Sequence, residues 1–503
     1  MKNIIEEYKV KSEEIEAEVE IKRTEDFVLF YELKFPRIAE GTMMLLNKVR
    51  AILLTEIPIK PSELVDLTSI ESLKKRFFER GVEVLKKEMP FIGINIQKYL
   101  IGSLMQEMFG LGKIEFLLAD PNLEEIVING SKNPVWVYHK KLGWLKTNVF
   151  VESESEILNY ANNIGRKVGR QITLLNPLMD AHLPTGDRVN ATLFPISTHG
   201  NTITIRKFRR SPWTITDFIE NKTLNYEVAA LIWLAIQYEM NMIVAGGTAS
   251  GKTSLLNVFM SFIPPNQRIV SIEDTRELQL ANFLHWVPLT TREPNPEGLG
   301  EVSMLSLLVN SLRMRPDRII VGEIRRAREA EVLFEAMHTG HSVYATLHAD
   351  TAEQALKRLI NPPIDVPESV IEALHLFAVA FRDRRLGIRR MLQLSEILPG
   401  TERSGPQLNT LYRWKPVKDE IIKENDSLRL VEEIRMHTGM TDDEIKKDIE
   451  EKIDILKWFV KNQIKDLEQL GHLIAIYYSD SEGMLKSLYA GEPPEKIIKS
   501  WFK

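Results

Sequence analysis

The stretch that decides the fold is MIVAGGTASGKTSLLNVFMSF, residues 242–262. It starts with the apolar run Met242–Ala245, continues into Gly246–Thr253, and ends in an apolar helical segment, Thr253–Phe262. The middle segment fits the pattern G-x-x-x-x-G-K-[ST]. Its glycines let the backbone curl so that several N–H groups face one phosphate chain, and the following helix N-terminus adds partial positive charge. A strand, this loop and a helix together predict a P-loop rather than a chance glycine-rich turn.

The loop also predicts how a nucleotide is bound. We expect Lys252 to contact the β- and γ-phosphates of ATP and the Thr253 hydroxyl to reach Mg²⁺. The expected nucleotide-binding residues are the whole octapeptide: Gly246, Gly247, Thr248, Ala249, Ser250, Gly251, Lys252 and Thr253.

Three further predicted strands have polar residues at their ends. They are Arg268–Ile272, Arg318–Val321 and Ser342–Thr346, and the amphipathic segments between them predict an α/β domain with a parallel sheet over residues 220–423. Ligands of such sheets bind at the carboxyl ends of the strands. We therefore expect one site beside the P-loop to gather Glu273, Asp274, Glu323, His341 and His348.

Each of these side chains has an expected role. Gly322 stands where many P-loop proteins carry an aspartate, so we expect Glu273 or Asp274 to supply the carboxylate for Mg²⁺ and Glu323 to activate water. The histidines can sense the γ-phosphate. Taken singly, each side chain is also typical of a solvated loop or a helix cap, so the expectation depends on their convergence.

The rest of the chain predicts four segments around this domain. Residues 1–100 are charged with helical periodicity, and we expect a helical region there with one strand at Phe27–Tyr31. Residues 101–208 predict an α+β domain, residues 209–219 a proline-interrupted linker, and residues 424–503 a helical extension.

The amino-acid composition excludes several kinds of functional site and disfavours others. The 503 residues include no cysteine, which excludes disulfides, thiolate zinc sites, iron–sulfur clusters and cysteine nucleophiles. The net charge of −5 disfavours nonspecific nucleic-acid binding. No apolar run is long enough to span a bilayer, and the first residues lack an apolar signal core. We expect a cytoplasmic protein that meets the membrane through a protein partner or by docking on its surface.

Four segments resemble the secretion ATPase superfamily of type II and type IV secretion, type IV pili and archaella. Besides the P-loop, they are an aspartate box, an atypical Walker B segment that includes Gly322, and a histidine box: Ser271–Leu278, Arg315–Arg325 and Thr339–Ala349. Three upstream segments resemble the N-terminal domain of that family: Leu117–Ile126, Asp180–Val189 and Thr204–Phe208.

The resemblance implies a RecA-like ATPase domain that follows an α+β domain, with ATP bound between these two domains. It further implies that the subunits form a homo-hexameric ring. It also implies an integral membrane platform protein as partner, and thus a peripheral position at the inner face of the membrane. Arg188 and Arg206 are the implied catalytic arginines, with Arg170 and Arg210 as further candidates. Without the four-cysteine zinc module of bacterial type II members, the chain resembles the archaeal branch.

Two other functions stay open at this stage. A nucleic-acid translocase of the same superfamily could use a basic cluster in its pore, formed by Arg382, Arg384, Arg385, Arg389 and Arg390. The acidic net charge favours a charged patch at a strand edge or a subunit interface as the explanation of this cluster. A scaffold that binds ATP without hydrolysing it is the third possibility, and the full set of carboxylates argues against it.

Overall fold

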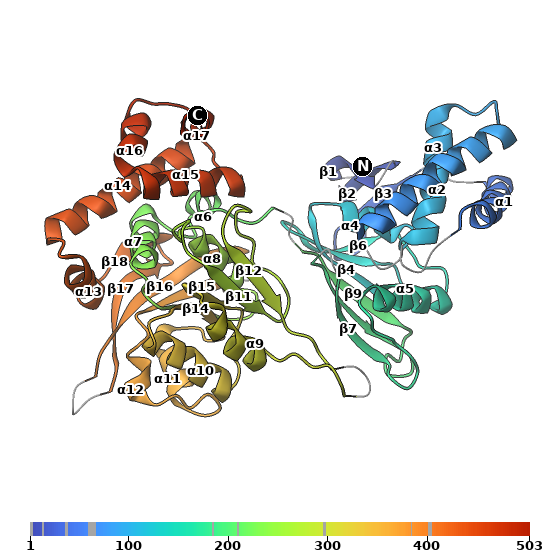
Figure 1. The fold of residues 1–503 in the computed structure, drawn as a ribbon. Helices are drawn as coiled ribbons and strands as arrows, with labels where there is room; N and C mark the ends of the chain where they lie inside the picture. Colours follow the sequence, from blue (N-terminus) through green and yellow to red (C-terminus); the bar gives the residue numbers. More distant parts are fainter. Residues whose placement is uncertain are drawn as a thin grey trace. The chain divides into compact units, whose positions relative to one another are not determined.

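The computed structural model describes residues 4–12, 15–35, 39–58, 67–183, 186–208, 211–294, 298–383, 385–400 and 405–502. The chain forms two compact units, Met1–Arg209 and Arg210–Lys503 (Figure 1). None of the helices in these ranges has the length and apolar character needed to span a bilayer.

The first unit is built on one mixed sheet with the strand order β1-β2-β3-β6-β5-β4-β9-β8-β7. Neighbouring strands are antiparallel except β3 and β6, which are parallel. The strands are β1 Ile4–Ser12, β2 Ile15–Lys22, β3 Phe30–Lys34, β4 Leu123–Asn129, β5 Trp136–His139, β6 Gly143–Thr147, β7 Leu178–His182, β8 Arg188–Thr192 and β9 Thr202–Arg206. The helices are α1 Glu40–Glu56, α2 Leu67–Glu88, α3 Ile94–Phe109, α4 Ile114–Ala119 and α5 Glu154–Lys167.

The prediction of a helical region over residues 1–100 is wrong for its first third. Strands β1, β2 and β3 lie there and extend the sheet of the α+β domain through β6, and the single expected strand at Phe27–Tyr31 begins instead at Phe30. In β2 the sequence IEAEVEIK alternates buried and exposed positions at its start. This two-residue period is the signature of a strand, and the many charged residues hid it. The helices α1, α2 and α3 follow and share a core of their own.

The second unit contains the P-loop on a sheet ordered β12-β11-β13-β14-β10-β15-β16-β17-β18. The first six strands are parallel and the last three continue antiparallel, which confirms the predicted α/β fold. The strands are β10 Met242–Gly246, β11 Ile269–Glu273, β12 Trp286–Thr290, β13 Arg318–Val321, β14 Ser342–Leu347, β15 Leu376–Asp383, β16 Ile388–Leu398, β17 Gln407–Lys415 and β18 Glu420–Lys423.

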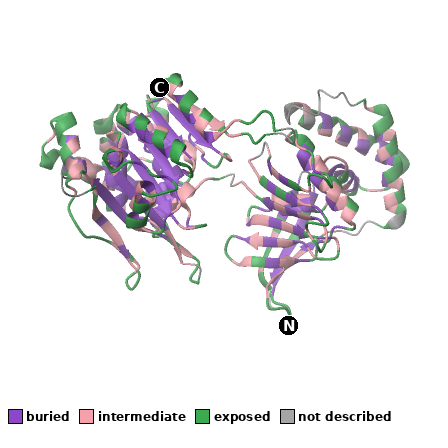
Figure 2. Cartoon of the chain, turned by 90° about the horizontal axis from the view of Figure 1, so that it is seen from below, coloured by how far each residue is buried: buried purple, intermediate pink, exposed green. Residues whose placement is uncertain are grey.

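Helices cover both faces of this sheet. Alternate residues of each strand point to opposite cores, as in β10, where Val244 packs on one face and Ile243 and Ala245 on the other. Since both faces are covered, every residue of β10 is buried, and Figure 2 shows the central strands as the most buried part of the unit. The helices of one face are α9 Met304–Ser311, α10 Ala327–His338, α11 Ala352–Ile360 and α12 Glu368–Ile371, and a short 3-10 turn, Leu312–Met314, follows α9.

The opposite face is covered by helices from both ends of the unit. They are α6 Ile215–Glu220, α7 Tyr226–Gln237, α8 Lys252–Met260, α13 Arg429–Thr438, α14 Asp442–Lys461, α15 Leu467–Ser479, α16 Ser481–Tyr489 and α17 Pro494–Trp501. The last five occupy the predicted helical extension, but they share one hydrophobic core with the P-loop sheet and are part of this unit.

The predicted linker over residues 209–219 is also shorter than expected. Helix α6 begins at Ile215, where a capping box between Thr214 and Asp217 starts it, and its apolar side chains join the core of the second unit. The proline at 212 was a correct sign of an interruption, but the chain is already helical three residues later.

A buried contact between α7 and α15 joins the C-terminal helices to the core of the P-loop unit. Trp233 is fully buried, stacks on Phe262 with ring centroids 4.9 Å apart, and donates its indole N–H to the Tyr478 hydroxyl over 2.9 Å. The same hydroxyl donates to the Phe262 carbonyl oxygen over 2.7 Å. One tyrosine oxygen therefore satisfies two groups of the P-loop unit's core.

We predict that Tyr478→Phe lowers the free energy of unfolding by about 1–3 kcal/mol, because it leaves a buried indole N–H without an acceptor. Urea unfolding followed by tryptophan fluorescence measures this. Tyr489→Phe is the matched control, because Tyr489 is 65% exposed and bonds only the Asp454 carboxylate at the surface; its effect should stay within about 0.5 kcal/mol. Equal effects of the two substitutions would contradict the prediction.

Candidate active site

The P-loop joins the carboxyl end of β10 to the start of α8, and two of its glycines are required by the geometry. A Cβ atom at Gly246 would lie 2.4 Å from the Ser250 hydroxyl oxygen and 2.6 Å from the Ala380 carbonyl oxygen. Gly251 caps α8 with φ of 92°, a left-handed conformation that side chains disfavour. The loop is therefore curled tightly against its sheet, and its backbone leads directly into a helix N-terminus, where anions are favoured.

Lys252 lies folded over this loop. Its ammonium group donates to the carbonyl oxygens of Gly246, at 2.9 Å, and Gly247, at 3.1 Å. Burial lowers the pKa of Lys252, and the nearby carboxylates of Glu323 and Asp350 partly oppose this shift. A cation that is held by neutral carbonyl groups and is partly desolvated favours an anionic partner.

The loop after β14 lies against the P-loop. The hydroxyl of Thr248 and Nε2 of His348 are hydrogen-bonded over 2.9 Å. The Asp350 carboxylate approaches Gly247 so closely that a Cβ atom there would lie 2.6 Å from its Oδ1 atom. Arg358, on α11, donates to the His348 carbonyl oxygen and fixes the loop from behind. His348 is thus placed beside the P-loop, as its position after the strand predicted.

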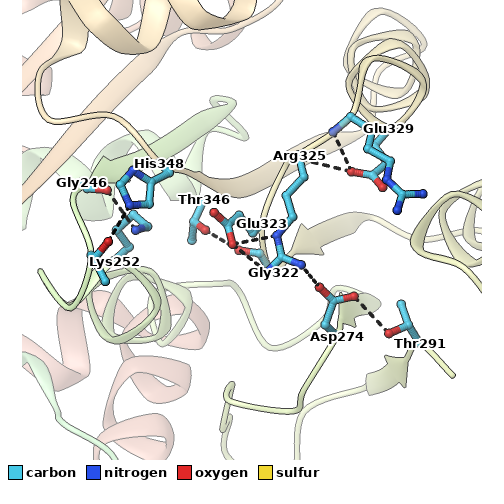
Figure 3. A network of polar contacts seen from close by, with 12 residues as sticks. Gly246, Lys252, Asp274, Thr291, Gly322, Glu323, Arg325, Glu329, Thr346 and His348 are labelled. Atoms are coloured by element: carbon cyan, nitrogen blue, oxygen red, sulfur yellow. Dashed lines mark hydrogen bonds and ion pairs between the residues drawn. The ribbon is translucent and has the colours of Figure 1, made fainter. Parts of the chain in front are cut away.

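Asp274 and Glu323 meet at the same edge of the sheet, where Arg325 bridges them (Figure 3). The guanidinium group donates from Nε and Nη2 to Oε2 of Glu323, at 3.0 and 2.9 Å, and from Nη1 to Oδ2 of Asp274, at 2.6 Å. The Thr291 hydroxyl donates to the other Asp274 oxygen over 3.0 Å. The carboxyl ends of β11 and β13 therefore present a linked pair of carboxylates.

Glu273 is not placed as expected for a metal ligand. Its side chain is buried, and Oε1 accepts the backbone N–H groups of Glu277, at 2.9 Å, and Leu278, at 3.1 Å. Burial raises the pKa of Glu273 to about 7 despite these donors. Because successive strand residues point to opposite faces, Glu273 turns inward to hold the following loop while Asp274 turns toward Arg325. Within the described ranges, no group of three or more carboxylate or imidazole side chains is arranged to hold a metal ion.

His341 lies at the wrong edge of the sheet for the expected role. His341 precedes β14, whereas His348 follows it, and at roughly 3.3 Å per residue the six-residue strand between them spans about 20 Å. The Nδ1 atom of His341 lies 3.2 Å from the Ala336 carbonyl oxygen, at the end of α10. The expectation that both histidines converge on the P-loop of one chain is therefore wrong, because the residue before a strand and the residue after it lie at opposite ends of the sheet.

The two implied arginines belong to the first unit. Arg188 on β8 and Arg206 on β9 lie directly opposite each other in the antiparallel register, and both are exposed. Arg188 also pairs with Asp180 over 2.7 Å. Arg170 follows α5 in the same unit, and Arg210 lies outside the described residues. Catalytic roles for these arginines stay predictions.

The basic cluster considered for a translocase is divided by the structure. Arg390 is buried and bonds both oxygens of Asp419, at 2.7 and 2.8 Å, and these hydrogen bonds lower the pKa of Asp419 to about 2. Arg389 instead points to the P-loop, with Nε 3.4 Å from the Ala249 carbonyl oxygen. Arg382 lies opposite Arg389 in the register of β15 and β16, while Arg384 lies outside the described residues. This arrangement gives no support to a nucleic-acid surface.

Comparison with known proteins identifies the family of this chain. The pattern of the family described as "Type II/IV secretion system protein" matches residues 147–372. The type IV secretion system protein PtlH of Bordetella pertussis is 32% identical over 274 residues, which cover 50% of this chain and 80% of PtlH. The chain belongs to the type II/IV secretion system protein family.

Other relatives of this secretion-family chain cover more of its length. An uncharacterised protein of Methanocaldococcus jannaschii is 38% identical over 416 residues, 81% of this chain and 75% of that protein. The X-ray structure of the Legionella pneumophila ATPase DotB is 20% identical, with a TM-score of 0.41, over 74% of this chain and 92% of DotB.

Three site residues of this family member were missed by the sequence reasoning: Arg325, Asp350 and Arg358. Arg325 and Asp350 lie within a few positions of a strand end that was identified, so proximity along the chain was an available signal for these two, whereas Arg358 lies on α11. The contacts of Arg325 with Asp274 and of Asp350 with Gly247 depend on which strands are neighbours in the sheet, and the local sequence carries no such information.

The position of Glu273 leads to a prediction for stability. Because folding raises the pKa of this carboxyl group from 4.5 to about 7, the folded state binds its proton more tightly than the unfolded state does. The stability from this group is fully present below pH 4.5 and is lost as the pH rises through 7. Relative to Glu273→Gln, we expect the wild type to lose on the order of 3 kcal/mol between these limits.

Thermal unfolding of the nucleotide-free proteins at a series of pH values measures this difference. Glu331→Gln, an exposed substitution on α10, is the control and should follow the wild-type curve. Parallel pH curves for the wild type and Glu273→Gln would contradict the prediction.

Proposed function

We propose that this chain is a Mg²⁺-dependent ATPase, a secretion-type motor whose hydrolysis site is the P-loop edge of the second unit. The observation that carries the proposal is the meeting of two sets of groups at that edge. One set is the curled loop with Lys252, and the other is the carboxylate pair Asp274 and Glu323 from adjacent strands. Membership of the type II/IV secretion family supports ATP as the substrate.

The residues present fit the triphosphate of ATP. The loop is curled so tightly that a side chain at Gly246 would clash with Ser250 and Ala380. Lys252 lies over the loop, and its hydrogen-bond acceptors among the described residues are two carbonyl oxygens. Phosphate oxygens are stronger partners for an ammonium group than neutral carbonyl oxygens are. We propose that the backbone N–H groups of residues 246–253 and the Lys252 side chain bind the phosphates.

We propose that Mg²⁺ binds at the same end of the sheet, beside Thr253, the second residue of α8. Its hydroxyl is the group that we propose to hold the ion, whereas Glu273 is committed to backbone N–H groups and holds the loop that carries Asp274. When bound, Mg²⁺ supplies positive charge that neutralises the phosphate oxygens.

Two further roles in hydrolysis are activation of the attacking water and stabilisation of the negative charge on the phosphates. Glu323 orients and deprotonates the attacking water, and His348, through its bond to Thr248, responds to the contents of the loop. Arg188 and Arg206 are proposed to add positive charge during hydrolysis, because both are exposed and occupy paired positions on neighbouring strands.

The larger assembly is also a proposal. PtlH is named as part of a type IV secretion system, and we propose that this chain likewise works as a homo-hexameric ring on an integral membrane platform protein, at the inner face of the membrane. Its work is to drive protein secretion or the assembly of a type IV pilus-like filament or archaellum.

Steady-state phosphate release tests the enzyme proposal. We expect Mg²⁺-dependent turnover that stops when EDTA is added, and a loss of ATP binding in Lys252→Ala. Glu323→Gln should still bind ATP, while kcat falls by about 10²- to 10⁴-fold, the usual contribution of a general base.

Lys357→Ala and Glu331→Gln, two exposed substitutions on α11 and α10, serve as controls and should retain wild-type turnover. Wild-type kcat in Glu323→Gln would remove Glu323 from the mechanism. Wild-type turnover in Lys252→Ala would place the active site elsewhere.

Size and partner are tested with the full chain. In the presence of ATP, we expect Glu323→Gln to form particles of six chains by mass photometry. Partner binding is tested by substitution rather than by deletion of residues 1–100, because that deletion would remove three strands of the sheet. Exposed apolar residues at and before the start of α3 are better targets: Phe91, Ile94 and Ile96.

Replacing these three residues by serine should abolish co-purification of an integral membrane protein from detergent-solubilised native membranes. Phe27→Ser, which replaces another exposed apolar residue of this unit, is the control and should preserve co-purification. A membrane partner that is retained by the triple variant would contradict this placement of the docking surface.

A further inference from the structure

Arg325 connects two carboxylates that come from different strands. It lies two residues beyond Glu323, which follows β13, and it reaches Asp274, which follows the neighbouring strand β11. Nε, Nη1 and Nη2 each donate to one of these two side chains, so every nitrogen of the guanidinium group is used. The planar fork of arginine can do this, whereas the single ammonium group of lysine cannot bond both partners with the same geometry.

The bonds to Glu323 are one-sided. Both Arg325 donors bind Oε2, and in the described part of the chain no group donates to Oε1. Figure 3 shows Glu323 between Arg325 and the P-loop residues Lys252 and Gly246. The electrostatic influence of Glu323 on Lys252 agrees with this position. One oxygen of the carboxylate is thus fixed, and the other is left to accept a proton.

The backbone of Arg325 is itself held in place. Its N–H group donates to Oε2 of Glu329 over 3.1 Å, and the N–H group of Arg326 donates to the same oxygen over 3.1 Å. Glu329 lies in the first turn of α10 and is buried. On the far side, Asp274 is held by the Thr291 hydroxyl. The guanidinium group therefore has fixed supports at both ends.

We propose that Arg325 is a positioning residue for ATP hydrolysis, which holds Glu323 with its Oε1 atom presented to the attacking water. The proposal rests on the ATPase function proposed above. Arg325 also offsets the repulsion that would push the carboxylates of Glu323 and Asp274 apart. It acts through Glu323 and need not touch the nucleotide.

This role predicts a specific kinetic pattern. Arg325→Ala should lower kcat by about 10²-fold, the scale expected for a misplaced reacting group, while KM for ATP changes by less than about threefold. Arg325→Lys keeps the charge without the fork and should have an intermediate kcat. Arg328→Ala, an exposed arginine on the neighbouring α10, is the matched control and should behave as the wild type.

A double variant separates positioning from other effects. If Arg325 acts through Glu323, adding Arg325→Ala to Glu323→Gln should change single-turnover hydrolysis by less than about twofold, since the group to be positioned is already lost. A further loss of about 10²-fold in that background would overturn the proposal, because Arg325 would then act independently of Glu323. Fluorescent ATP-analogue binding and thermal unfolding check that each variant is folded, and Arg325→Lys serves if the alanine variant is not.

Other outcomes are equally decisive. Wild-type kcat in Arg325→Ala, or a raised KM with unchanged kcat, would overturn the positioning role while the ATPase function stands. A wild-type chain that shows no Mg²⁺-dependent turnover would overturn the proposed function, and this inference with it.

Discussion

The register of the parallel sheet is the constraint on which the site depends. Ala245 of β10 pairs with Leu347 of β14, and Val321 of β13 pairs with both Ala345 of β14 and Ile272 of β11. Because these strands have cores on both faces, a one-residue shift of any of them would turn each of its side chains toward the opposite core, where it does not fit. The same pairing brings the residues after each strand to one edge. Hydrophobic burial thus brings the charged groups of the site to one end of the sheet.

The edge of this sheet is organised by hydrogen bonds that differ in kind from those of the core. The Thr346 hydroxyl donates to the carbonyl oxygen of Gly322, Glu273 holds the backbone after β11, and Arg325 links Asp274 to Glu323. These contacts tie β11, β13 and β14 together just beyond their ends. They connect the carboxylates to the frame that carries the P-loop, so a change in one loop can alter the position of the others.

Features that depend on neighbouring residues in the chain could be predicted from the sequence, and features that depend on distant residues could not. The P-loop, Asp274, Glu323 and His348 were found because each follows a strand that the sequence shows, and parallel strands end at one edge. His341 was misplaced because it precedes its strand, and Glu273 because the alternation of strand side chains turned it inward. The strands β1 and β2 were missed because charged residues on their exposed face resembled a solvated helix. Arg325 was missed because its partner Asp274 is 51 residues away in the chain.

The sequence by itself determined the P-loop, the α/β class of the second unit and the family, since each depends on local patterns of glycine, charge and apolar periodicity. Tertiary structure decided which strand ends meet, which carboxylates face Arg325, and that helices α13–α17 complete the core of the P-loop unit. These features depend on contacts between distant segments. A local pattern shows that a helix or strand has an apolar face, but only packing selects the surface against which that face is buried.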